Sequence, residues 1–335
     1  MTSRSRRRFK IVITGSLTKM QSMARQVLGK YADVVVFDGT REEELTDHIK
    51  DADAIMVVHD FSLSLKTIEK LDRCKAIICC SVGFNNVDIS CARNRKIPVI
   101  NIPDYGTEEV ANSAIGLMLT LVRGISFLNS FLRENNGPWS FQHGPPRYRL
   151  RDRVFGIAGL GRIGTATALR AQRLGMNVAF YDPYKKDGFD KALGLTRIET
   201  LPELLEKSFV LSLHCPLTPE TTKMINSSAI SNMPKGAYLI NTARGPIVET
   251  DAIPNAISSG QLAGAGIDVL ENEPPDPTDP LIKAWRDPSH PAYHRTVINS
   301  HTAFYSEEGL LEIQTKAVEA CRRVLLGLPL RNIVN

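Results

Sequence analysis

The sequence shows little that would mark a secreted, membrane-spanning or metal-binding protein. Its six cysteines form no CxxC pair, which argues against a disulfide framework or a zinc site and favours a reduced intracellular protein. No apolar run is long enough to span a bilayer. The N-terminal MTSRSRRRFKIVITG contains only a three-residue apolar run, which is too short for the core of a signal peptide. We therefore expect no metal site, no membrane segment and no leader.

The excess of positive over negative charge is also small. The 41 Lys and Arg residues exceed the 36 acidic residues by only five, and five basic residues lie within the first ten positions. A broad nucleic-acid-binding face is therefore not expected. The basic positions are interpreted as an arm before the first strand, with a nuclear-localisation signal as the alternative. The expected location is cytoplasmic, with the nucleus possible.

What the sequence does contain is typical of a globular protein. Hydrophobic residues make up 43% and charged residues 23%, so wholesale disorder is excluded. A length of 335 residues indicates one large or two ordinary domains.

Short β-prone runs alternate with helical patterns through the first hundred residues. The predicted strands are Ile11–Thr14, Val34–Phe37, Ala54–Val58, Ala76–Cys80 and Val99–Ile102, with helical patterns such as Met20–Lys30 and Leu65–Leu71 between them. This alternation predicts βαβ units with a parallel sheet covered on both faces. The region is expected to form its own small domain.

A second βα series is predicted from residue 154 onward, with the strand-like runs VFGIAG, NVAFYD, FVLSLHC, AYLINT, GAGIDV and TVINS. Each run ends in small or polar residues, where an open α/β sheet builds its ligand crevice. Residues 108–133 are apolar almost all round, which predicts one long helix buried between layers. The Pro-rich residues 271–295 are expected to be irregular, and residues 307–326 are predicted to form an amphipathic helix.

The sharpest local signal is a GxGxxG motif between a predicted strand and a predicted helix: Gly159, Leu160, Gly161, Arg162, Ile163 and Gly164. Gly159 permits the tight turn, and Gly161 lets the backbone approach a pyrophosphate. Gly164 lets the helix pack closely on the strand. The helix N-terminus adds free N–H groups and positive potential. The motif therefore predicts a dinucleotide site.

Asp182 predicts which dinucleotide binds. It ends the next predicted strand, 18 residues beyond Gly164, so its carboxylate is placed to bond the adenosine ribose hydroxyls and to repel a 2′-phosphate. Lys185 and Lys186 weaken this preference, because either ammonium group could pair with a phosphate. We expect NAD as the cofactor.

Three further segments each follow a predicted strand of the second series, and they carry Arg244, Glu273 and His301. Parallel strands would bring these side chains to one edge of the sheet. Arg offers a planar fork for a carboxylate, His readily gives and takes a proton near neutral pH, and a neighbouring carboxylate favours imidazolium. Each residue taken singly has an ordinary structural explanation. His214 is the serious rival as proton donor, although we place it beside the cofactor.

These motifs, from SVGFNNVD (81–88) through GLGRIG, FYDPY, HCPLT, NTARGPIVE, GIDVLENEP and SHTAFYSEE, resemble the D-isomer-specific 2-hydroxyacid dehydrogenase family over nearly the whole chain. FYDPYKKDGFDKALGLTRIETL (180–201) resembles in particular the branch that contains the C-terminal-binding protein corepressors. The resemblance implies two doubly wound parallel-sheet α/β domains. A flavodoxin-like substrate domain would comprise 1–106 and 304–335, and a Rossmann NAD-binding domain would comprise 107–303. It also implies a homodimer formed largely through the cofactor domains.

By motif, the resemblance assigns Arg244 to the substrate carboxylate and 2-oxo group, His301 to acid/base chemistry and Glu273 to the partner of His301. It places the backbone amides of Val82 and Gly83 at the substrate carboxylate. Positions matching the nicotinamide side of the cofactor site are Cys215, Pro216, Thr242, Ala243 and Asp268. Phe84, Phe304 and Tyr305 are expected to line the pocket for the substrate side chain, which favours a medium-sized apolar group.

Several positions depart from the corepressor branch. Cys79 replaces a basic residue, Phe304 replaces a tryptophan, and the Pro-rich stretch is longer than expected. These differences favour an NAD-dependent enzyme that interconverts a small 2-oxo acid and a D-2-hydroxy acid. The alternative is an NAD(H)-responsive dimeric binding protein with residual dehydrogenase activity.

Overall fold

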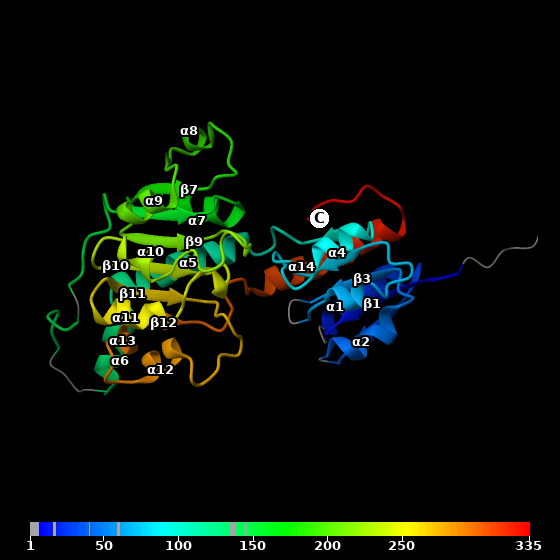
Figure 1. Cartoon of the computed structure of the whole chain (residues 1–335), viewed down its shortest axis with the longest axis horizontal. Helices are drawn as coiled ribbons and strands as arrows, with labels where there is room; N and C mark the ends of the chain where they lie inside the picture. The colour runs from blue at the N-terminus through cyan, green and yellow to red at the C-terminus, as the bar shows by residue number, and fades with distance from the viewer. Residues whose placement is uncertain (1–6, 16–17, 40, 59–60, 135–138, 145) are drawn as a thin grey trace, which may run out of the picture. The chain divides into compact units, whose positions relative to one another are not determined.

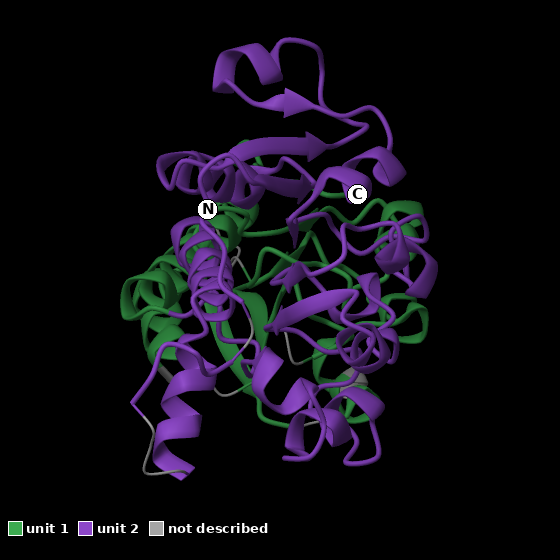
Figure 2. Ribbon diagram, turned by 90° about the vertical axis from the view of Figure 1, so that its left-hand side faces the viewer, with its two compact units in different colours: residues 1–106, 306–335 green, residues 107–305 purple. Residues whose placement is uncertain are grey.

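The structure is a computed structural model that describes residues 7–15, 18–39, 41–58, 61–134, 139–144 and 146–335. It divides into two compact units (Figure 1, Figure 2). Unit 1 comprises Met1–Gly106 and Ser306–Asn335, and unit 2 comprises Thr107–Tyr305. The chain thus returns to unit 1 at Ser306, close to the expected residue 304.

Unit 1 is built on a five-stranded sheet in the order β2-β1-β3-β4-β5, in which every pair is parallel. Its strands are β1 (Phe9–Thr14), β2 (Ala32–Phe37), β3 (Ala54–Val57), β4 (Ile77–Cys79) and β5 (Val99–Ile100). Its helices are α1 (Thr18–Leu28), α2 (Glu42–Ile49), α3 (Leu65–Ile68), α4 (Ile89–Asn94) and α14 (Glu307–Leu325). This strand order is the flavodoxin-like one, and α14 packs against α1 and β3.

Unit 2 is built on a seven-stranded parallel sheet in the order β12-β11-β10-β9-β6-β7-β8. Its strands are β6 (Val154–Ala158), β7 (Asn177–Tyr181), β8 (Thr196–Arg197), β9 (Val210–Leu213), β10 (Ala237–Asn241), β11 (Leu262–Ile267) and β12 (Thr296–Ile298). Its helices are α5 (Thr107–Val122), α6 (Ile125–Glu134), α7 (Arg162–Arg173), α8 (Phe189–Leu193), α9 (Leu201–Lys207), α10 (Ser227–Ser231), η1 (Gly245–Ile247), α11 (Ala252–Ser258), α12 (Pro280–Arg286) and α13 (Ala292–Arg295).

The strand order of unit 2 is that of a Rossmann sheet, so the predicted fold class is confirmed for both units. The chain order reverses between β6 and β9, and ligands of such sheets bind at the carboxyl ends of the strands at that reversal. The sheet is covered on both faces, since β9 is buried throughout and β10 likewise. This explains why the predicted strands are continuous apolar runs.

The prediction of one long helix over residues 108–133 is wrong. The chain forms two helices, α5 and α6, bent by 55° relative to each other. Gly124 separates them with a φ of +64°, a left-handed conformation that ends a helix. Within the described part of the chain, α5 buries seven side chains whereas α6 buries none. No single helix there has the length and apolarity to cross a membrane. The bent pair α5 and α6 reaches that length and apolarity only when the two helices are counted together.

The prediction that residues 271–295 are irregular is also wrong in part. The short helices α12 and α13 lie within this stretch. Asp279 caps α12, since its Oδ1 accepts hydrogen bonds from the backbone N–H groups of Leu281 and Ile282. Pro280 at the first helical position favours the start of the helix rather than breaking it.

Candidate functional site: a glycine turn and an Arg–Glu–His set in unit 2

The glycine turn after β6 can be built only from glycines at its first and last motif positions. Gly159 has a φ of +93°, and a Cβ on it would lie 2.7 Å from the backbone nitrogen of Cys215. A Cβ on Gly164 would lie 2.1 Å from the carbonyl oxygen of Gly159. Gly159 therefore permits the turn, and Gly164 lets α7 approach it.

Gly161 is different, because no described atom lies within 4 Å of the position that its Cβ would take. Gly161 precedes α7, which begins with Arg162 and Ile163, so the first backbone N–H groups of the helix have no acceptor within the helix. Thr242, directly after β10, contributes a buried hydroxyl that has no hydrogen-bond partner among the described residues. Open space at a helix N-terminus and an unsatisfied hydroxyl nearby along the sheet edge fit a bound dinucleotide.

Asp182 lies where the sequence predicted it, directly after β7. Its Oδ2 accepts a hydrogen bond from the backbone N–H of Leu160 at 2.8 Å, and its Oδ1 accepts one from Tyr184 at 3.0 Å. The carboxylate thus joins the loop after β7 to the glycine turn. The ammonium group of Lys185 lies 5.0 Å from the ring centroid of Phe189, which gives it a partner on α8.

His214 and Cys215 follow β9 and border the glycine turn. The Nε2 atom of His214 lies 2.9 Å from the hydroxyl of Ser212. Burial of the ring lowers the pKa of His214 to about 3, so the imidazole is neutral near pH 7. Burial likewise raises the pKa of Cys215 to about 12. The next residue, Pro216, is exposed. A neutral His214 is a poor proton donor, which argues against it as the acid of the site.

Arg244 lies in a turn after β10 that is organised by Asn241, a fully buried side chain. The Asn241 Oδ1 accepts a hydrogen bond from the backbone N–H of Ala243, and its Nδ2 donates one to the carbonyl oxygen of Arg244. The guanidinium of Arg244 donates to the carbonyl oxygen of Ala243 at 2.7 Å. A single amide side chain therefore fixes the backbone that presents Arg244.

Gly245 lets the Arg244 turn approach the loop after β11. A Cβ on Gly245 would lie 2.0 Å from the carbonyl carbon of Leu270. The backbone N–H of that same Leu270 donates to Oε1 of Glu273 at 2.8 Å. The close approach at Gly245 thus brings the turn that carries Arg244 beside the loop that carries Glu273.

His301 and Glu273 are joined directly, with Nδ1 of the imidazole 2.6 Å from Oε2 of the carboxylate. Burial raises the pKa of Glu273, but the hydrogen bonds from His301 and Leu270 and the charges of His301 and Arg244 together lower it below its usual range. Glu273 is therefore ionised near neutral pH. The ring of Phe304 stands edge-on to His301, with centroids 6.3 Å apart.

Asp268 shapes the loop that carries His301. It is 2% exposed, and its carboxylate accepts hydrogen bonds from the backbone N–H groups of Thr302 and Ala303. Its carbonyl oxygen accepts one from the N–H of His301, whose φ is +54°. Burial raises the pKa of Asp268, and the two backbone donors oppose that shift. Asp268 thus holds His301 in an unusual backbone conformation.

The predicted substrate loop belongs to unit 1. Val82 and Gly83 follow β4, and the buried Asn101 holds their backbone by donating to the carbonyl oxygen of Val82 at 2.7 Å. Sequence reasoning missed Asn101, Asn241 and Gly245. Asn241 is the last residue of β10 and Asn101 directly follows β5. A polar residue at the end of an apolar run can be noticed in the sequence, but only the fold reveals what it bonds.

Comparisons with known proteins show the family to which the chain belongs. Residues 115–303 match the family model described as D-isomer specific 2-hydroxyacid dehydrogenase, NAD binding domain. A glyoxylate reductase from Thermofilum pendens is 37% identical over 265 residues, which cover 77% of this chain and 77% of that protein. A D-3-phosphoglycerate dehydrogenase from Methanocaldococcus jannaschii is 32% identical over 97% of this chain, but the chain spans only 59% of its length.

A solved structure is also closely similar. The D-lactate dehydrogenase of Aquifex aeolicus, crystallised with NAD and lactic acid, superposes with a TM-score of 0.84 at 28% sequence identity. The similarity covers 95% of this chain and 96% of that one. The chain therefore belongs to the D-isomer-specific 2-hydroxyacid dehydrogenase family, and its unit 2 contains the NAD-binding domain of that family.

Proposed function

We propose that the protein is an NAD-dependent oxidoreductase that interconverts a 2-oxo acid and a D-2-hydroxy acid. The observation that carries the proposal is the contact between His301 and Glu273 in the same unit as the dinucleotide turn. A proton donor held by an ionised carboxylate is what reduction of a carbonyl group requires besides the hydride. The glyoxylate reductase and D-lactate dehydrogenase relatives support the substrate class.

Each residue of the set has a distinct role in this proposal. Bound NADH supplies the hydride. His301 contacts Glu273 through Nδ1, and the proton on its other ring nitrogen, Nε2, is donated to the oxygen of the former carbonyl group, so a hydroxyl forms. Glu273 orients the imidazole for this transfer. Arg244 binds the substrate carboxylate and 2-oxo group through its planar fork.

Three other predicted residues bear on the substrate. The backbone amides of Val82 and Gly83 are proposed to hold its carboxylate, and Phe304 is proposed to border its side chain. An aromatic ring next to His301 favours an apolar substituent over a phosphate.

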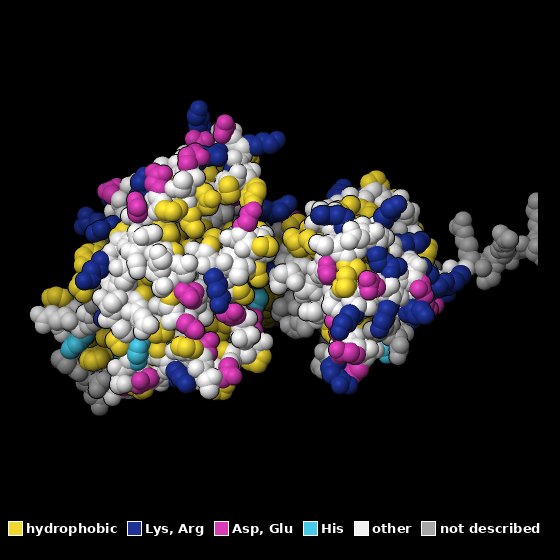
Figure 3. All heavy atoms as spheres, in the orientation of Figure 1, with side chains coloured by type: hydrophobic (Ala, Val, Ile, Leu, Met, Phe, Trp, Pro, Cys, Tyr) yellow, Lys and Arg dark blue, Asp and Glu magenta, His cyan; other side chains and the backbone are white. Residues whose placement is uncertain are grey.

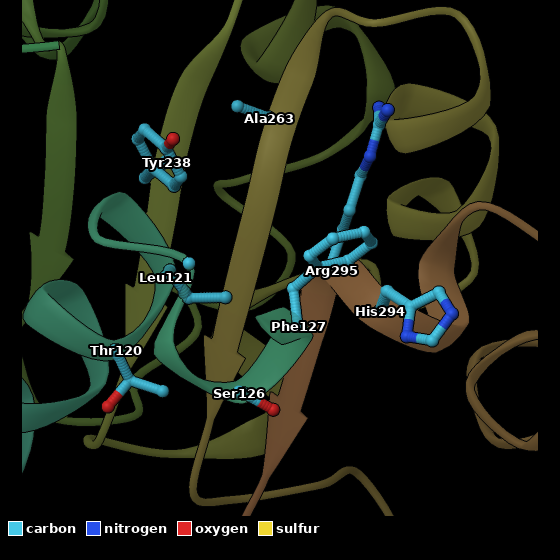
Figure 4. A pocket seen from close by; sticks show the side chains of 9 residues that line it. Thr120, Leu121, Ser126, Phe127, Tyr238, Ala263, His294 and Arg295 are labelled. Atoms are coloured by element: carbon cyan, nitrogen blue, oxygen red, sulfur yellow. The ribbon is translucent and has the colours of Figure 1, made fainter. Parts of the chain in front are cut away.

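We also propose that the protein is a homodimer through unit 2. Helix α6 leaves Ile125 55% exposed, and the following segment leaves Trp139 and Phe141 89% and 85% exposed. Large apolar side chains exposed to this extent are the kind that an interface covers. Figure 4 shows the side chains that line a small hollow beside α6, among them Phe127 and His294, whose rings meet edge to face with centroids 4.9 Å apart. A second copy of the chain is the occupant that the family resemblance implies.

A panel of aliphatic, aromatic and acidic 2-oxo acids, offered with NADH and with NADPH, tests the proposed reaction. At least one should be reduced with a kcat of about 1–1000 per second, the ordinary range for enzymes. Failure across the whole panel with NADH binding intact would favour the alternative, a dimeric NAD(H)-responsive binding protein of the corepressor type.

Light scattering of the parent and of Trp139→Glu tests the dimer, since the substitution should shift the mass toward that of a monomer.

A further inference from the structure

Tyr184 and Glu220 form a bridge that no predicted role requires. The hydroxyl of Tyr184 donates a hydrogen bond to Oε2 of Glu220 at 2.6 Å. Tyr184 lies in the loop after β7 and Glu220 in the loop after β9. Because β7 and β9 are the two neighbours of β6 in the sheet, the bridge joins the loops on either side of the glycine turn.

The bridge continues directly into the cofactor site. The backbone N–H of Tyr184 donates to Asp182, whose other carboxylate oxygen accepts from Leu160 in the glycine turn. Through the side chain and the backbone of Tyr184 and the carboxylate of Asp182, these hydrogen bonds link the loops after β9, β7 and β6. The hydrogen bond to Glu220 and the charge of Glu220 raise the pKa of Tyr184, as expected when a phenol donates to an ionised carboxylate.

The loop that carries Glu220 is tightly folded by its own hydrogen bonds. The hydroxyl of Thr221 donates to the carbonyl oxygen of Pro216 at 2.7 Å, and the hydroxyl of Thr222 donates to that of Thr218 at 2.8 Å. The backbone N–H of Thr218 donates to Thr221 in turn. Glu220 is thus held at a defined position, although its side chain and that of Tyr184 are exposed.

We propose that Tyr184 and Glu220 complete the adenosine half of the cofactor site. The bridge positions the two loops that flank the glycine turn, and Glu220 places a second negative charge near Asp182 that opposes a 2′-phosphate. Figure 3 shows that side chains of both signs gather around α8, next to this region. Of the two lysines expected to favour a phosphate, Lys185 stacks on Phe189 there. This inference rests on the cofactor part of the proposed function and extends it to specificity.

Binding of cofactors and their fragments, without any substrate, tests the inference. Titrations would measure the affinities of the whole chain, residues 1–335, for NADH, NADPH, ADP-ribose and nicotinamide mononucleotide. Tyr184→Phe keeps the ring but removes the hydrogen bond, and it should weaken NADH and ADP-ribose about threefold, the worth of an exposed hydrogen bond. It should leave nicotinamide mononucleotide unchanged. Glu220→Gln should lower the ratio of NADH to NADPH affinity about threefold.

The same unit offers a matched control. Tyr293 donates a hydrogen bond to Glu134 at 3.1 Å, so it forms a second tyrosine–glutamate pair, on α13 and α6. Tyr293→Phe should leave all four affinities unchanged. If Tyr184→Phe and Glu220→Gln behave like this control while the parent protein binds NADH, the inference is wrong and the proposed reaction stands. If the parent protein binds neither dinucleotide, the cofactor assignment fails and the inference fails with it.

Discussion

The Nδ1 atom of His301 lies 2.6 Å from Oε2 of Glu273, although 28 positions separate the two residues in the sequence. Glu273 follows β11 and His301 follows β12, and these strands are parallel neighbours. The pair therefore results from the topology of the sheet. The charge of Arg244, from the loop after β10, helps to keep Glu273 ionised.

Replacing Glu273 should change the pH dependence of the reaction. Glu273→Gln replaces the ionised carboxylate beside the proton donor with a neutral amide, and reduction needs a protonated donor. A neutral partner stabilises the charged form of a donor less, so the falling limb of kcat/KM for 2-oxo acid reduction should move to lower pH. A full pH–rate profile with a saturating NADH concentration measures the shift. A profile that coincides with that of the parent would mean that Glu273 does not tune the donor.

The cofactor preference should follow Asp182. The parent protein should have a kcat/KM with NADH at least about tenfold higher than with NADPH, which corresponds to about 1.4 kcal/mol. Asp182→Ser should narrow this ratio, because it removes the charge that repels a 2′-phosphate. Equal use of both cofactors by the parent would indicate that Lys185 and Lys186 dominate the site.

Alanine substitutions at two glycines of the same motif should affect different properties, stability in one case and NADH affinity in the other. Gly164→Ala places a methyl group against the carbonyl oxygen of Gly159, so the free energy of unfolding should fall by about 1–3 kcal/mol. Gly161→Ala meets open space, so stability should change little while the affinity for NADH falls. Denaturant unfolding and NADH titration of both variants separate the two effects. Equal loss of stability in both would contradict the assignment of Gly161 to the ligand.

His214 should make the protein sensitive to acid. Its pKa is about 3 in the folded state but near the usual value of about 6.5 in the unfolded chain. Between these values the unfolded state binds an extra proton, so stability falls as the pH decreases, by at most about 1.4 kcal/mol per pH unit. His214→Gln should flatten this dependence between about pH 6.5 and pH 4. Identical pH slopes of unfolding free energy for parent and variant would show that His214 is not held neutral.

The sequence predicted those parts of the structure that depend on local pattern. Apolar runs between helical patterns predicted both sheets. The spacing of Gly159, Gly161 and Gly164 predicted the turn, because the conformation that needs these glycines extends over only a few residues. Strand ends located Arg244, Glu273 and His301 because parallel strands place their carboxyl ends at one edge. What these residues contact there was left to the resemblance.

The features that sequence reasoning missed depend on contacts between distant segments. Gly245 looks like any loop glycine until Leu270 is seen against it. Asn241 and Asn101 act through backbone groups that carry no sequence signal. The break at Gly124 was missed because apolar residues continue on both sides of it. The apolar pattern indicated one helix, and the sequence does not show the left-handed φ of Gly124 that ends α5. The Pro-rich composition of residues 271–295 predicted an irregular segment, whereas Pro280, with Asp279 before it, starts a helix.

The most direct test of the account compares two histidine substitutions. His301→Gln keeps the approximate volume of the side chain but removes the titratable proton, so kcat for 2-oxo acid reduction should fall by about 100- to 10,000-fold, the usual contribution of a positioned acid. Its affinity for NADH should change little. His214→Gln, which replaces a neutral imidazole, should retain turnover. If His214→Gln abolishes turnover while His301→Gln is nearly silent, His214 is the proton donor and the role assigned to the His301–Glu273 pair is wrong.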